Sequence, residues 1–189
     1  MSSQPAIDFL LRQLDDAWRG LQDWLDGLSE AEFQWRPVEN VWHLEQRNGR
    51  WTIPYSWIPP DPAPLPTIAW HMAHLATSKL LVVEHAFGER KKRLENLAVP
   101  HTAAEMAEYL AGCHSAFLKA VASLTDDDLP LIRYTDWGEQ RTTAQIVGSA
   151  ILHDVEHGAQ ITTLRAMYRH LRHSGLRYPP APGDATEWR

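Results

Sequence analysis

The amino-acid sequence predicts an all-α fold, a four-helix bundle, and three observations support this prediction. Four segments, each of about 20 residues or more, carry hydrophobic residues at spacings of three and four. Proline-rich or polar stretches separate these segments. The length of 189 residues and the hydrophobic content of 44% suit one domain with a sizeable core. We therefore expect a single domain over residues 1–189, with its core over about 5–170 and an irregular tail over 171–189.

The first predicted helix covers residues 5–28. Its apolar side chains recur at spacings of three and four, which places them on one face: Ile7, Leu10, Leu11, Leu14, Trp18, Leu21, Leu25 and Leu28. Ser29 then precedes a short helical turn, "EAEFQWRP", which ends at Pro37.

The segment between the first and second helices is expected to be a hairpin followed by a crossover. Asn48-Gly49 lies between two stretches of partial alternation, and this pair favours a type I′ turn because both positions need positive φ. A short two-stranded β-hairpin is therefore predicted there. The stretch "IPPDPAPLP" cannot continue a helix or a central strand, so it is predicted to be a proline-rich crossover that wraps the surface.

The second and third helices each begin after a threonine that can cap a helix. Thr67 precedes a segment that is apolar nearly all round and that ends at Gly88, so this helix is predicted to be the most buried. Thr102 precedes the third helix, over roughly 103–124.

The fourth helix follows a loop with a short strand expected at 131–134. Thr142 or Thr143 begins this helix, which is predicted to run to about His170. Its core-facing residues are Ile146, Ala150, His153, His157, Ile161, Leu164 and Tyr168.

Charge and composition exclude several classes of protein. The net charge of −6 and the pI near 5.9 argue against nucleic-acid binding, which usually needs a basic surface. The sequence contains no run of about 18 apolar residues, so a membrane span is not expected. The N-terminal segment carries acidic residues and does not resemble a signal peptide. The single cysteine, Cys113, has no intrachain partner for a disulfide. A cytoplasmic protein is expected.

Two histidines on the fourth helix indicate a metal site. His153 and His157 are four residues apart on the core-facing side, so their imidazoles converge. The alternative is a pair of neutral, hydrogen-bonded core histidines, because burying an unpartnered imidazole costs roughly 2 kcal/mol or more. A site needs a third ligand, and the second helix offers His71, His74 and His85. Three histidines plus water would leave an open coordination position, as in catalytic sites.

Three stretches also resemble a known family. "LHDVEHGAQI" resembles the C-terminal helix signature of the DinB-like superfamily, which includes the YfiT-like metalloproteins, and "TIAWHMAHLA" resembles its second-helix signature. "LSEAEFQWRP" is similar to the stretch after the first helix of that family. The resemblance implies a four-helix bundle with a divalent metal, commonly zinc or nickel. It assigns the ligands to His74, His153 and His157.

The resemblance also implies a function. Characterised relatives include transferases and isomerases that use a low-molecular-weight thiol such as mycothiol, bacillithiol or glutathione. The leading hypothesis is therefore a metal-dependent transferase in which a metal-bound thiolate attacks an electrophilic small molecule. The alternatives are a metal-dependent hydrolase, a non-enzymatic, stress-associated metal-binding homodimer, and a bundle that has lost its metal. Whether the chain is an enzyme stays open.

Two further assignments accompany the leading hypothesis. Arg165 lies two turns beyond His157 and is a candidate for binding a carboxylate of the thiol cofactor; the alternative is a surface salt bridge. Four tryptophans either line the mouth of the bundle or simply pack: Trp42, Trp51, Trp57 and Trp70.

Overall fold

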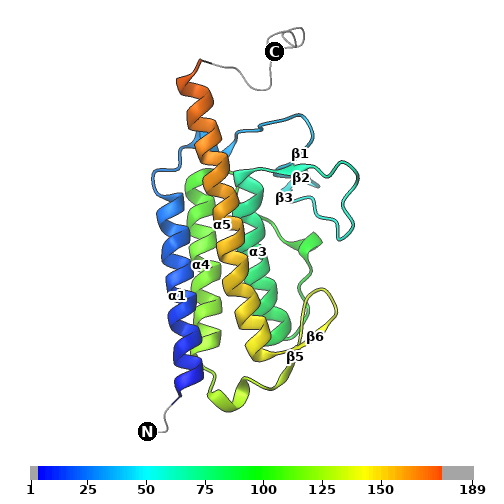
Figure 1. Cartoon of the computed structure of the whole chain (residues 1–189). Coiled ribbons are helices and arrows are strands. Elements are labelled where there is room, and N and C mark those ends of the chain that lie inside the picture. The colour runs from blue at the N-terminus through cyan, green and yellow to red at the C-terminus, as the bar shows by residue number, and fades with distance from the viewer. Residues whose placement is uncertain (1–3, 176–189) are drawn as a thin grey trace.

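The computed structural model describes residues 4–175, and four long helices dominate it (Figure 1). The predicted all-α four-helix bundle is confirmed. Helices α1 and α5 run in one direction and α3 and α4 in the other, with α1 beside α5 and α3 beside α4 (Figure 1). The four helices are α1 (Pro5–Leu25), α3 (Ile68–Ala86), α4 (Ala103–Ala122) and α5 (Thr143–His173).

The connection between α1 and α3 begins with a short helix. Helix α1 ends at Leu25, three residues before the predicted end, because Gly27 adopts a positive φ of 63° that terminates the helix. The expected helical turn is α2 (Glu30–Phe33). Its capping box joins Ser29 and Glu32, each side chain bonding the backbone N–H of the other residue.

The predicted β-hairpin is present after α2. Strands β2 (Glu45–Arg47) and β3 (Arg50–Thr52) pair antiparallel, and Asn48 and Gly49 between them have φ values of 51° and 75°. The proline-rich crossover does contain one strand that was not predicted. Strand β4 (Leu65–Pro66) pairs in parallel with β1 (Val41–Trp42), which ties the end of the crossover to the segment that precedes the hairpin.

The predicted caps at Thr67 and Thr102 are confirmed, and of the two threonines considered for the start of the last helix, Thr142 is its cap. The hydroxyl oxygens of Thr67, Thr102 and Thr142 accept hydrogen bonds from backbone N–H groups in the first turns of α3, α4 and α5. Helix α5 continues to His173, so the predicted end at His170 is three residues short. Residues 176–189 of the expected irregular tail lie outside the described residues.

Two connections complete the bundle. The α3–α4 connection carries the short 3-10 helix η1 (Leu94–Asn96) along the bundle from one end to the other (Figure 1). After α4, η2 (Asp126–Asp128) leads to β5 (Ile132–Tyr134), the expected strand. Its antiparallel partner, β6 (Gln140–Thr142), was not predicted.

The core lies between the four helices, and α3 is buried along most of its length, as its sequence predicts. One glycine sets the distance between α1 and α5. A Cβ added to Gly158 would lie 2.2 Å from ring carbons of Trp24, so only glycine allows this close approach. Within residues 4–175, no helix combines the length and the apolar content needed to cross a bilayer.

Candidate metal centre

Three histidines from two helices, α3 and α5, converge between these helices. His74 lies in the second turn of α3, and His153 and His157 lie in the middle of α5. His153 Nε2 is 3.0 Å from His74 Nε2 and 3.0 Å from His157 Nε2. The structure therefore brings together the three residues that the family resemblance selects.

The arrangement of these nitrogens fits a metal ion. Two nitrogens each bonded to one ion at about 2.0–2.1 Å are about 2.9–3.4 Å apart at angles between 90° and 110°. The observed 3.0 Å separations match this range. Hydrogen bonding alone accounts for the cluster poorly, because a neutral imidazole carries only one N–H and His153 Nε2 has two close nitrogen neighbours. The cluster can thus hold a divalent metal.

Burial keeps the ligands in the form that binds a metal. Burial, and secondarily the charges of the neighbouring histidines, lower the pKa of His74 well below its usual value. The same causes, together with the charge of Lys79, lower the pKa of His153 to about 3, and burial also lowers the pKa of His157. All three imidazoles are therefore neutral at pH 7, and each has a lone pair available for a metal.

The other two histidines of α3 lie elsewhere. His71 is buried behind the cluster, with its Nδ1 2.8 Å from Nδ1 of His157. It contacts His157, a candidate ligand, at Nδ1, on the opposite side of that ring from the converging Nε2 atom. The Nε2 of His85 instead lies 2.9 Å from the backbone carbonyl of Lys92, outside the cluster. Of the three candidates that the sequence left open, His74 is the one that forms a cluster with His153 and His157 able to hold a metal ion.

Aromatic rings fix the orientation of His74. Its imidazole stacks on Trp70, with ring centroids 4.6 Å apart, and also lies nearly parallel to Tyr55 at 5.6 Å. Trp70 stacks in turn on Trp42 and donates its indole N–H to the carbonyl of Pro54 at 2.7 Å. The segment inserted between α1 and α3 therefore supports a candidate ligand directly. Trp51 packs away from the cluster, stacked on His101.

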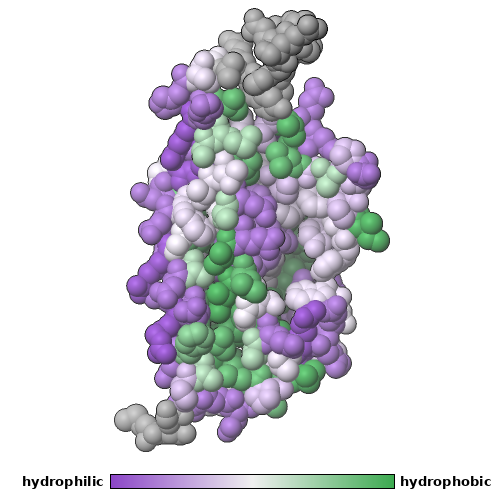
Figure 2. All heavy atoms as spheres, viewed as in Figure 1, coloured by the Kyte–Doolittle hydropathy of each residue, from purple (hydrophilic) through white to green (hydrophobic). Residues whose placement is uncertain are grey.

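A cavity of about 270 Å³ opens beside the cluster. His74 and His153 form part of its wall, which is otherwise mainly apolar. Three aromatic wall residues come from connections rather than from the bundle helices: Tyr55, Trp57 and Trp137. Figure 2 shows the surface hollowed between α5 and these connections. A small molecule in this cavity would lie against two of the three candidate ligands.

A buried ion pair lies next to the cluster. Lys79 Nζ is 2.5 Å and 2.6 Å from the two carboxylate oxygens of Asp154, and both side chains are almost fully buried. Burial lowers the pKa of Lys79 and raises that of Asp154, while their mutual attraction opposes both shifts. Asp154 directly follows His153, so the pair anchors the ligand-bearing turn of α5 to α3. The sequence signal for this pair is the one lysine of α3, a mainly apolar helix.

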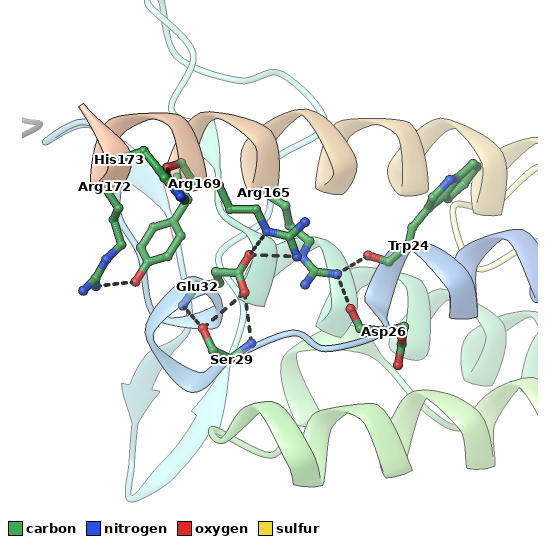
Figure 3. Close-up of polar contacts among 9 residues, drawn as sticks. Trp24, Asp26, Ser29, Glu32, Arg165, Arg169, Arg172 and His173 are labelled. Atoms are coloured by element: carbon green, nitrogen blue, oxygen red, sulfur yellow. Dashed lines mark hydrogen bonds and ion pairs between the residues drawn. The ribbon is translucent and has the colours of Figure 1, made fainter. Parts of the chain in front are cut away.

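Arg165 belongs to an internal network at the end of α1 (Figure 3). Its Nε donates to Glu32 Oε1 at 3.2 Å, and its Nη1 donates to the carbonyls of Trp24 and Asp26. Burial raises the pKa of Glu32, but hydrogen bonds from Arg165 and Ser29 outweigh it, so that pKa lies below its usual value. Arg165 is not part of the cavity wall. It joins α5 to α2 and the end of α1, and we propose no thiol-binding role for it.

The surroundings of the single cysteine do not favour a nucleophilic thiolate. Cys113 is buried on α4, and burial raises the pKa of its thiol. It packs there as a small residue of the hydrophobic core.

Comparisons with known proteins agree with this architecture. The model of the DinB superfamily matches residues 13–161, and the chain therefore belongs to the DinB superfamily. The crystal structure of a DinB-like protein from Bacillus cereus ATCC 10987 is similar to this chain, with a TM-score of 0.56 and 18% sequence identity. The match covers 92% of this chain and 95% of that chain, and at this identity it shows the shared fold. No curated protein matches the chain.

Proposed function

We propose that this protein binds one divalent metal ion, zinc or nickel, through His74, His153 and His157. The converging Nε2 atoms carry this proposal. Three neutral nitrogen ligands leave the charge of the cation uncompensated and one or more coordination positions open. The cavity beside His74 and His153 supports the proposal, because it has room for a small molecule next to two of the three candidate ligands.

We further propose a metal-dependent transferase that uses a low-molecular-weight thiol of the mycothiol, bacillithiol or glutathione type. A bound divalent metal would favour thiolate over thiol and so supply the nucleophile. The mainly apolar wall limits access of water, and the Lys79–Asp154 pair and the stacked Trp70 hold the ligands in place. The electrophile would occupy the cavity between Tyr55, Trp57 and Trp137.

The test begins with elemental analysis of tag-free protein beside His74→Ala and His153→Ala variants. We expect about one zinc or nickel ion per wild-type chain and loss of the metal from both variants. Assays with electrophiles and the three thiol classes would follow. A wild-type protein that takes up neither metal on incubation would overturn the proposal.

Metal-dependent hydrolysis is a second candidate, because an open position beside three neutral ligands also suits a bound water. Turnover without added thiol would distinguish it from thiol transfer.

Self-association remains a further prediction. Figure 2 shows hydrophobic surface along α5, where Leu152 and Val155 are 70% and 44% exposed. Light scattering of the purified protein would measure its oligomeric state.

A further inference from the structure

One carboxylate in the cavity is left without an ion-pair partner. Asp136 is the only acidic side chain among the described residues that line the cavity beside His74 and His153. None of the ion pairs within residues 4–175 involves it. It lies in the turn between β5 and β6 and is half-buried. A desolvated carboxylate of this kind favours a positively charged ligand.

No other group of the cavity wall supplies that positive charge. The ammonium of Lys79 also reaches the wall, but it contacts both carboxylate oxygens of Asp154. Burial raises the pKa of the Asp136 carboxyl, and the smaller opposing effects come from its own backbone and from His85. Asp136 is therefore the one charged side chain of the described wall that takes part in no ion pair, although Arg47, Arg50 and Arg93 line the hollow next to it.

Aromatic rings gather around the same carboxylate. Trp137 follows Asp136 in the chain, and its ring centroid is 6.4 Å from that of Trp57. Trp57 in turn packs edge-on against Tyr55, at 5.4 Å. Burial and the charge of Asp136 both raise the pKa of Tyr55, which agrees with a phenol close to this carboxylate. Faces of tryptophan and tyrosine attract organic cations, most strongly where water is limited.

Asp136 also has a distinct position relative to the metal cluster. It lines a second, neighbouring hollow of about 480 Å³, whereas His74 and His153 line only the first cavity. It therefore lies where the two hollows join. A ligand in the first cavity can place one end near the metal cluster and the other beside Asp136.

We propose that the cavity selects a small organic cation, an amine protonated at neutral pH on an apolar or aromatic body. Its ammonium contacts Asp136, and its body packs on Tyr55, Trp57 and Trp137. This assignment deepens the proposed function, on which it rests, because it names the chemical class of the substrate that reaches the metal-side end of the cavity. A cavity of about 270 Å³ suits one aromatic ring with a short side chain.

The test measures binding of three probes with matched skeletons to chelator-treated, metal-free protein. The probes are 2-phenylethylamine, 2-phenylethanol and 3-phenylpropanoate, followed by tryptophan fluorescence and NMR shift titration. We expect the amine to bind about 10-fold or more tightly than the alcohol, since a charged hydrogen bond is gained, and the carboxylate to bind least. Metal-free protein is used because the amine could otherwise bind as a ligand of the metal. The result then tests Asp136 independently of metal uptake.

Two variants test whether Asp136 causes the preference for the amine. Asp136→Asn should bring the affinity for the amine down to that for the alcohol. Glu95→Gln removes one negative charge from the second hollow only and should leave the preference for the amine unchanged. Equal binding of amine and alcohol by the wild type, or a preference that survives in Asp136→Asn, would overturn the assignment. Thermal melts of both variants verify that they are folded. Failure of metal uptake in the separate elemental analysis would overturn the proposed metal centre instead.

Discussion

The Nδ1 atoms of His71 and His157 lie 2.8 Å apart, which joins a buried histidine of α3 to a candidate metal ligand of α5. One of the two nitrogens must donate a proton to the other. If Nε2 of His157 binds a metal through its lone pair, the ring proton of His157 lies on Nδ1. That N–H group then donates a hydrogen bond to Nδ1 of His71. A hydrogen bond of this kind fixes both the tautomer and the orientation of a ligating imidazole.

Replacement of His71 by phenylalanine should therefore weaken metal binding without removing a ligand. We expect a loss of zinc affinity of about 10–100-fold, measured by competition with a chromophoric chelator. His85→Phe is the matched control, because His85 is a buried histidine of the same helix that lies outside the cluster. Equal zinc affinities in His71→Phe and wild type would show that this contact does not orient His157.

The Lys79–Asp154 pair should be costly to break on one side only. Lys79→Met leaves the buried carboxylate of Asp154 without its partner, and we expect the free energy of unfolding in urea to fall by about 3–5 kcal/mol. The double variant Lys79→Met/Asp154→Leu removes both charges and should recover most of that loss. A single variant that loses less than about 1 kcal/mol would mean that the pair is already hydrated.

Gly158 and Gly148 lie on the same helix and should respond in opposite directions to alanine. Gly158→Ala forces the ring of Trp24 to move, and we expect a net destabilisation of about 1–2 kcal/mol despite the better helix propensity of alanine. Nothing lies within 4 Å of a Cβ added to Gly148, so Gly148→Ala should stabilise the protein by about 0.5–1 kcal/mol. Urea unfolding of both variants measures the difference. Stabilisation by both substitutions would show that α1 and α5 can separate at no cost.

Acid should destabilise the metal-free protein through its buried histidines. Burial, followed by the charge of Lys79, lowers the pKa of His114 to about 4 from the usual 6.5. The unfolded chain therefore binds this proton more readily than the folded chain. The contribution of His114 to the free energy of unfolding is fully present above pH 6.5 and is lost as the pH drops from 6.5 toward 4. For this one group we expect a loss on the order of 1–2 kcal/mol by pH 5.

A His114→Phe variant isolates that contribution. Both ring nitrogens of His114 are buried without a hydrogen-bond partner, and the ring stacks on Trp18 with centroids 4.0 Å apart. Phenylalanine keeps the stacking and removes the titrating group. Urea unfolding between pH 4.5 and 7.5 should then show a shallower dependence on pH than in the wild type. Identical slopes would indicate that His114 does not titrate over this range.

Much of the site could be predicted where the relevant geometry is local. His153 and His157 are one turn apart on a helix, so their convergence follows from helical spacing alone. The choice of His74 needed the family resemblance. Helix α3 is apolar nearly all round, and its periodicity therefore does not tell which of His71, His74 and His85 faces α5.

The sequence by itself determined the four helices, their threonine caps and the Asn48-Gly49 hairpin, because backbone hydrogen bonds and φ preferences act between near neighbours. Only the tertiary structure decided which distant side chains meet. Lys79 and Asp154 are 75 residues apart, and Asp136 joins Tyr55 and Trp57 from a different connection. Such contacts depend on how the helices pack and where the connections cross them. The spacing of residues along one segment predicts neither the packing nor the crossing.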